Sequence, residues 1–91
     1  PAIVRDISVL VPKDVLVEDV MNVIEETAGK LIRDIDLFDI YEEIEEERKS
    51  LAFHLIFQLK ERAISPEEVE KAFQKIVENL EKNPNWEVRK K

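Results

Sequence analysis

Several residue types are missing or scarce in this 91-residue chain, and each absence excludes a class of structure. There are no cysteines, so neither a disulfide framework nor a cysteine-ligated zinc site can form. No apolar run approaches the roughly 20 residues of a membrane-spanning helix, and no signal peptide is visible. The length predicts one small domain over residues 1–91, which we expect to be a fragment of a longer chain.

Acidic residues dominate the charged positions. With 21 Asp and Glu against 14 Lys and Arg, the net charge of −7 by itself argues against general nucleic-acid binding, which normally shows a basic balance. The stretch Glu42 to Arg48 is the most acidic and predicts a solvated hairpin loop. A metal site in this stretch is disfavoured, because neither a histidine nor a regular ligand spacing accompanies its carboxylates.

The stretch from Ser50 to Gln58 predicts a central strand. Its alternate residues form a large apolar side, namely Leu51, Phe53, Leu55 and Phe57. The other side is mixed and consists of Ser50, Ala52, His54, Ile56 and Gln58. Because successive side chains of a strand point to opposite faces, one face is expected in a core and the other is less committed.

Two more strands and a helix precede this strand. Val4 to Val11 alternates and is rich in β-branched residues, which predicts a strand with Ile7, Val9 and Val11 toward the core. Glu18 to Ala28 has the apolar spacing of a helix, and Gly29 follows where a positive φ is needed. Leu31 to Tyr41 predicts a second strand. One side of it carries Ile35 and Leu37, and the other carries Asp34, Asp36, Phe38 and Ile40.

The C-terminal third predicts a helix and a short strand. Ser65, Pro66 and Glu68 have the spacing of a capping box with proline at the first helical position. The apolar stripe that follows predicts four to five helical turns and consists of Val69, Ala72, Phe73, Ile76, Val77 and Leu80. Asn83-Pro84 ends the helix, and Trp86 to Arg89 predicts a last short strand.

The resulting order, β-α-β-β-α-β, is typical of an α+β, ferredoxin-like split sandwich. In that architecture four strands form an antiparallel sheet, the first and third strands are central, and two helices cover one face. The other face is open. It is expected to carry Asp6, Ser8, Asp36, Phe38, Ser50, Ala52 and His54.

Such a face has the parts of a base-binding surface. An exposed aromatic ring stacks on any base, at about 1–3 kcal/mol per base. A carboxylate such as Asp36 can accept hydrogen bonds from the two adjacent donors on the edge of guanine, while small residues let the base approach. The alternative, which the pattern alone favours, is that Phe38 packs under a loop or a partner domain.

Several short motifs match a known family in order and spacing. They are Pro1 with Val4-Arg5-Asp6-Ile7, Leu37-Phe38-Asp39-Ile40-Tyr41, Lys49-Ser50-Leu51-Ala52-Phe53, Phe57-Gln58, Arg62, Ser65-Pro66-Glu67-Glu68-Val69, and Val88-Arg89. Over nearly its whole length the chain resembles the ferredoxin-fold anticodon-binding domain found at the C-terminus of the phenylalanyl-tRNA synthetase beta subunit.

The resemblance implies the same fold and the binding of the anticodon stem-loop of phenylalanine tRNA on the open face. The wobble base of that anticodon is a guanine. By residue-to-residue correspondence Asp36 would accept from the guanine edge and Phe38 would stack on the base. Ser8 and Ser50 would lie nearby.

Phosphate contacts are assigned by the same resemblance to Arg5 and Lys49, although Arg5 can equally pair with a neighbouring carboxylate. The sequence departs from the family in the stretch Glu42 to Arg48, which is shorter than usual, lacks glycines and is unusually acidic. Basic residues cluster at the C-terminus as Arg89, Lys90 and Lys91.

No catalytic constellation is predicted in this chain. His54 is its only histidine, and a half-buried position in the sheet is expected for it rather than a role as a base. The resemblance implies that the charging of tRNA with phenylalanine, with its ATP and magnesium, belongs to other parts of a cytoplasmic enzyme. The implied protein partners are the remaining beta-subunit domains and the alpha subunit, with no membrane. We therefore expect no cofactor and no metal in this domain.

A second hypothesis remains open, a ferredoxin-like protein–protein interaction module without RNA binding. The acidic balance favours this module, whereas the joint presence of Asp36, Phe38 and Ser50 at matching positions favours the tRNA-binding domain. The fold alone does not decide between them, because it supports many functions.

Overall fold

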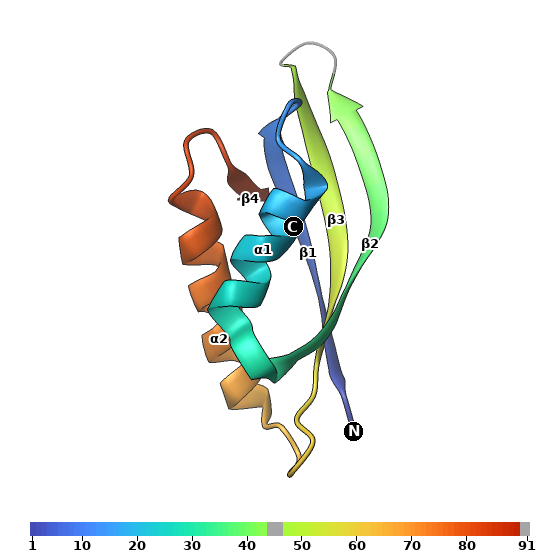
Figure 1. Cartoon of the computed structure of the whole chain (residues 1–91), viewed down its shortest axis with the longest axis vertical. Helices are drawn as coiled ribbons and strands as arrows, with labels where there is room; N and C mark the ends of the chain where they lie inside the picture. Colours follow the sequence, from blue (N-terminus) through green and yellow to red (C-terminus); the bar gives the residue numbers. More distant parts are fainter. Residues whose placement is uncertain (44–46, 90–91) are drawn as a thin grey trace.

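The computed structural model describes residues 1–43 and 47–89 and has the predicted order of elements (Figure 1). The elements are β1 (Ile3–Pro12), α1 (Val17–Ala28), a short 3₁₀ turn η1 (Gly29–Leu31), β2 (Ile32–Glu43), β3 (Arg48–Phe57), α2 (Pro66–Glu81) and β4 (Glu87–Arg89). The ferredoxin-like β-α-β-β-α-β prediction is therefore confirmed.

The four strands form one antiparallel sheet in the order β2-β3-β1-β4. As predicted, β1 and β3 are central. Both helices lie on one side of this sheet, and within the described residues the other side carries no helix (Figure 1). We call the side away from the helices the open face.

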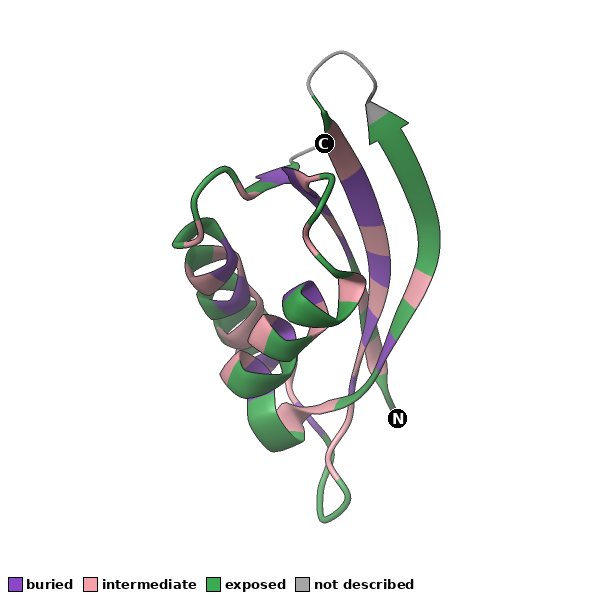
Figure 2. Cartoon of the chain, turned by 45° about the horizontal axis from the view of Figure 1, so that its top comes forward, coloured by how far each residue is buried: buried purple, intermediate pink, exposed green. Residues whose placement is uncertain are grey.

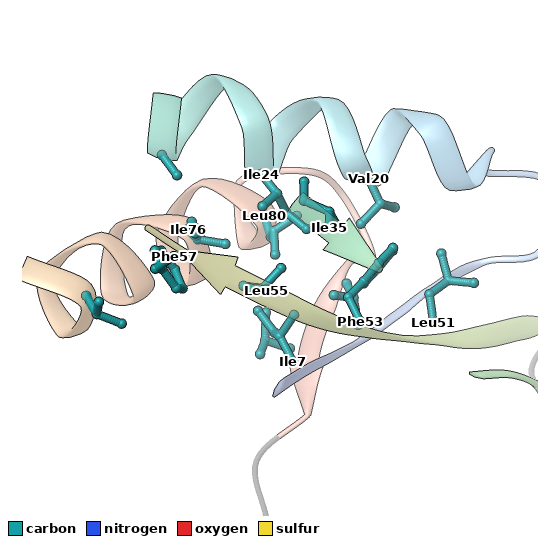
Figure 3. Packing of buried hydrophobic residues seen from close by; sticks show 14 of the residues in the cluster. Ile7, Val20, Ile24, Ile35, Leu51, Phe53, Leu55, Phe57, Ile76 and Leu80 are labelled. Atoms are coloured by element: carbon teal, nitrogen blue, oxygen red, sulfur yellow. The ribbon is translucent and has the colours of Figure 1, made fainter. Parts of the chain in front are cut away.

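The core lies between the sheet and the two helices. On β3 the four predicted apolar residues are completely buried, namely Leu51, Phe53, Leu55 and Phe57. Figure 3 shows side chains of β3 pointing into this layer, where Ile24 of α1 and Leu80 of α2 point toward them. Because burying one such side chain contributes about 1.5–3 kcal/mol, this layer holds the sheet and the helices together.

The predicted ends of the helices are confirmed. Ser65 and Glu68 exchange two hydrogen bonds, of 3.1 Å from the Glu68 N–H to the Ser65 Oγ and 3.0 Å from the Ser65 N–H to Glu68 Oε1. Hydrogen bonds from the Arg62 guanidinium, followed by the Ser65 N–H, lower the pKa of Glu68 to about 2. Gly29 has φ of +56° at the end of α1, a backbone conformation that favours glycine.

Two predictions about the long hairpin are wrong. β2 extends to Glu43 and β3 begins at Arg48, so the loop is shorter than the predicted Glu42 to Arg48. The reason is that cross-strand pairing continues into charged residues. Residues 44–46 of that stretch lie outside the described residues.

The second wrong prediction concerns the phase of β2, because the pairing of β2 with β3 shifts between Leu37 and Asp39. Such a β-bulge adds one residue and reverses the alternation beyond it. Ile40 therefore pairs with Leu51 of the core side, instead of sharing the open face with Phe38.

Candidate functional site

The open face is built from rows of paired residues, since partners in antiparallel register share a face. The His54 row contains Asp36, His54 and Asp6; the Ala52 row contains Asp39, Ala52, Ser8 and Arg89; the Ser50 row contains Tyr41, Ser50, Leu10 and Glu87. Successive rows are separated by about 7 Å, which is two residues of a strand. Figure 2 shows buried and half-buried positions alternating along β3, beside a largely exposed β2.

An aromatic pair lies on this face. The Phe38 and His54 rings are stacked, with their centroids 3.9 Å apart and their planes 9° apart. Phe38 reaches this position from the bulge of β2, and it remains 48% exposed. The expectation that Phe38 packs under a loop therefore does not hold for this chain alone.

His54 is fixed by a carboxylate as well as by the ring. Its Nδ1 lies 2.7 Å from Oδ1 of Asp6, its register partner on β1. Because an ionised carboxylate only accepts hydrogen bonds, Nδ1 donates to Asp6. The ring also stacks on Phe38, which belongs to β2. The imidazole is thus oriented by both neighbouring strands.

A cleft of about 610 Å³ opens beside this aromatic pair. We call it the Phe38 cleft; it is lined by Asp6, Ile7, Ser8, Phe38, Phe73, Gln74, Val77, Val88 and Arg89. It exists because β4 is short and pairs only with Ser8 to Leu10 of β1, so that no strand of the described residues covers the first half of that edge. Its volume lies within the range of sites for small ligands, about 300–1,000 Å³.

The charges around the Phe38 cleft are of both signs. Asp6 and Asp36 supply carboxylates in one row, and Arg89 lies in the next row beside Ser8. Arg89 makes no ion pair with any described residue. Carboxylates accept from the N–H groups of a polar ring, and a guanidinium binds phosphate. The arrangement suits a flat ligand that carries both ring N–H groups and a phosphate.

The structure brings together three of the six residues singled out from the sequence. Asp36, Phe38 and Ser8 lie on the open face in adjoining rows, and Phe38 and Ser8 line the same cleft. Ser50 lies on the same face, one row beyond Ala52, but only 7% of it is exposed. Its hydroxyl is therefore less accessible than that of Ser8.

Arg5 and Lys49 lie on the other side of the sheet. Arg5 is paired with Leu55 and Lys49 with Val11, and both partners are buried under the helices. Neither residue lines the Phe38 cleft, although the Arg5 guanidinium lies against Phe73, which does line it.

Arg5 has partners of its own on α2. Its Nη1 donates to Glu70 Oε1 at 2.8 Å, and its guanidinium carbon lies 4.0 Å from the centre of the Phe73 ring. Hydrogen bonds from Gln74 and then from Arg5 lower the pKa of the Glu70 carboxyl. The carboxylate pairing that the sequence left open for Arg5 is thus observed.

For three residues of the open face, the structure shows contacts or exposure that point to a role in the site. His54 has a ring partner, Arg89 is placed beside Ser8 by the register of β4, and Tyr41 is 62% exposed opposite Ser50. The alternation of β3 already places His54 on this face. Its pairing with Phe38 depends on the bulge, which the sequence does not reveal.

Metal ligands and membrane spans are not found in the part of the chain that the structure describes. Within residues 1–43 and 47–89, no group of three or more His, Asp or Glu side chains is arranged to hold a metal ion. Neither described helix has the length and apolar character needed to cross a membrane.

Comparisons with known proteins agree with the architecture. The family described as ferredoxin-fold anticodon binding domain matches residues 1–89. A phenylalanine–tRNA ligase beta subunit of Clostridium tetani is 38% identical over 91 residues, covering 98% of this chain and 12% of the relative. Those of Listeria monocytogenes and Bacillus cereus are 43% and 37% identical, covering 98% and 99% of this chain and 11% of each relative. The chain thus spans about a tenth of the length of these relatives.

Proposed function

We propose that this chain, which belongs to the family of ferredoxin-fold anticodon-binding domains, binds the anticodon stem-loop of phenylalanine tRNA on its open face. The observation that carries the proposal is Phe38, an aromatic ring that is 48% exposed beside a carboxylate and a cleft. An exposed ring of this kind offers a surface on which a base can stack.

The wobble guanine is proposed to occupy the Phe38 cleft. One face of the Phe38 ring already contacts His54, so the base stacks on the remaining exposed surface of the ring. Asp36 accepts hydrogen bonds from the two donors on the guanine edge. Ser8 and Ala52, which form the neighbouring row, are small and leave room for a base above the sheet.

The other candidate residues take different parts in this proposal. Ser50 supports the face from a buried position beside Leu10, because its side chain is hardly exposed. Arg89 replaces Arg5 and Lys49 as the phosphate contact near the base, since it lies on the open face without an ion-pair partner among the described residues.

In the whole protein we propose that this domain belongs to the beta subunit of a phenylalanine–tRNA ligase. The support is the match of almost the entire chain to about a tenth of each relative. The ATP-dependent charging of the tRNA, with its magnesium, then takes place in other domains and in the alpha subunit, in the cytoplasm. This chain supplies recognition of the anticodon and no reacting group.

One observation favours the second hypothesis, a protein–protein interaction module without RNA binding. The chain carries a net charge of −7, and a polyanion such as RNA is repelled by a negative domain. The two hypotheses differ in whether binding depends on the identity of the wobble base. An anticodon reader distinguishes guanine from adenine at the wobble position, and a protein-binding module does not.

The decisive experiment is the titration of a labelled phenylalanine-tRNA anticodon stem-loop with this chain at low salt. A second stem-loop carries adenine in place of the wobble guanine. We expect the guanine stem-loop to bind about 10-fold to 100-fold more tightly, since one good bidentate contact gives about 1–3 kcal/mol of discrimination. Equal binding of the two stem-loops, or no binding at high concentration, would exclude the proposed reading of the anticodon.

Asp36→Asn is the matching substitution. Because an amide presents a donor where the guanine edge also donates, this variant should lose most of the preference for guanine. The control is Glu78→Gln, which removes one carboxylate from the exposed surface of α2, away from the open face. If Asp36→Asn keeps the full preference, Asp36 does not contact the base.

A further inference from the structure

A second cleft lies at the opposite end of the sheet from the long hairpin, where β2 begins and β3 ends. Its volume is about 630 Å³, and its lining residues are Lys30, Ile32, Arg33, Gln58, Leu59, Lys60 and Glu61. We call it the Lys30 cleft. Three cationic side chains and one carboxylate line it, in a chain whose net charge is −7. The cleft is thus a basic site on an acidic domain.

Backbone features hold these cations in place. Lys30 belongs to η1, which begins at Gly29 with its positive φ. A register shift between Ile32 and Asp34 makes Arg33 the extra residue of a bulge, and its Nη1 donates to Gln58 Oε1 at 2.6 Å. The Gln58 N–H in turn donates to the Leu31 carbonyl at 3.0 Å, which ties the end of β3 to η1.

The single carboxylate in the Lys30 cleft has a cationic neighbour outside it. The pKa of Arg62 is raised above its ordinary value, first by its hydrogen bond to Glu68 and, as the smallest contribution, by the charge of Glu61. The negative charge of Glu61 therefore lies close to the Arg62 guanidinium. The lining of the cleft keeps a net positive charge.

The Lys30 cleft lies beyond the end of β3. That strand ends at Phe57, and Gln58, which lines the cleft, follows directly, four residues after His54. Four residues of a strand span about 13 Å, so the cleft begins about this far from the aromatic pair. A ligand that occupies the Phe38 cleft and extends along β3 reaches Arg33 and the two lysines.

We propose that the Lys30 cleft binds the phosphate backbone of the RNA whose wobble base occupies the Phe38 cleft. The inference rests on the proposed function and adds to it a backbone site formed by Lys30, Arg33 and Lys60. Guanidinium and ammonium groups are the usual partners of phosphate, and each neutralised phosphate releases counterions into solution. This local positive charge explains how a domain of net charge −7 holds a polyanion.

The test is the salt dependence of stem-loop binding. In the variant Lys30→Gln/Arg33→Gln/Lys60→Gln we expect the slope of log K against log salt to fall in magnitude by about 2, since each phosphate of a single strand that is no longer neutralised removes about 0.7. The preference for the wobble guanine should remain, because the Phe38 cleft is unchanged. The control, Lys71→Gln/Lys75→Gln/Lys82→Gln, removes the same charge from exposed positions on α2 and its C-terminal end and should keep the slope.

The double variant Lys30→Gln/Lys60→Gln keeps the bond between Arg33 and Gln58, so it tests the cleft if the triple variant does not fold. Its slope should fall by about 1.4. An unchanged slope in a folded cleft variant, or an equal fall in the control, would overturn the inference.

Two further outcomes are informative. If the cleft variants lose binding of poly-L-glutamate while their RNA slope is unchanged, the cleft serves an acidic protein segment and the inference is wrong. If the unmodified chain binds no stem-loop, the proposed function and the inference both fail. Binding by the unmodified chain with an unchanged slope in the variants refutes only the inference.

Discussion

The two faces of this sheet differ in what their side chains contact, although the same strands supply both. On β3, Phe53 is completely buried against the helices, while its neighbour His54 faces the other way and stacks on Phe38. The helix side is apolar and closed. The open face carries rings, carboxylates and an arginine, and some of these residues line the Phe38 cleft together with residues of α2. One alternating strand therefore stabilises the fold and carries part of the candidate site.

Two phenylalanines illustrate the difference. Phe53 is 0% exposed and Phe38 is 48% exposed, although the two residues lie on neighbouring strands, β3 and β2, that are paired to each other. The first ring contributes to the stability of the fold and the second is available to a ligand. Substitutions should therefore separate stability on one face from binding on the other.

The largest expected effect is on the buried face. Phe53→Ala should lower the free energy of unfolding by about 3–5 kcal/mol, because it removes a buried ring and leaves a cavity. Urea denaturation followed by circular dichroism measures this. A decrease below about 1 kcal/mol would mean that the helices do not close over β3 as described.

The corresponding change on the open face is Phe38→Ala. We expect it to weaken stem-loop binding by about 1–3 kcal/mol, the contribution of one stacked base. The free energy of unfolding of this variant should fall by about 0.5–1.5 kcal/mol, the usual contribution of an aromatic pair such as the stack on His54. A variant that unfolds would place Phe38 in the core and remove the contrast between the two faces.

The fold follows from local signals, and this explains why it is predictable. The alternation of β3, the capping box at Ser65 and the position of Gly29 each depend on a few neighbouring residues, and all three are confirmed. The bulge near Phe38 is not predictable in this way. It depends on pairing with another strand, and a shift of one residue leaves no local pattern.

The candidate site is predicted less completely. Alternation along β1 already places Arg5 on the same side as Ile7, toward the helices, so the phosphate contact assigned to Arg5 by motif matching conflicts with its own strand pattern. The same holds for Lys49, which shares a side with Leu51. The contact between His54 and Asp6 requires the register of two strands far apart in sequence.

His54 offers a sharper test of the open face, with a smaller expected effect. His54→Asn keeps a donor near Asp6 but removes the ring, whereas His54→Phe keeps a ring and removes the donor. If the stack positions Phe38 for the base, His54→Asn should weaken binding by about 0.5–1.5 kcal/mol, the usual contribution of an aromatic pair. His54→Phe should bind nearly as well as the unmodified chain.

The opposite ranking of these two variants would assign the effect to the hydrogen bond with Asp6. Binding titrations with the wobble-guanine stem-loop distinguish the two results. Proton NMR of the ligand-free chain supplies an independent check, because ring-current shifts of the Phe38 protons report the stack without RNA.

The smallest expected effect concerns Arg5, the cation that the sequence motifs and the structure place differently. Its contacts with Glu70 and the Phe73 ring lie on the helix side of the sheet. Arg5→Gln should therefore lower the free energy of unfolding by about 0.5–1 kcal/mol, as expected for a partly exposed cation–π contact. Stem-loop affinity and its salt slope should be unchanged, whereas Arg89→Gln should reduce both. If Arg5→Gln instead reduces the magnitude of the slope by about 0.7, RNA reaches the helix side of β1 and the division of roles between the two faces is wrong.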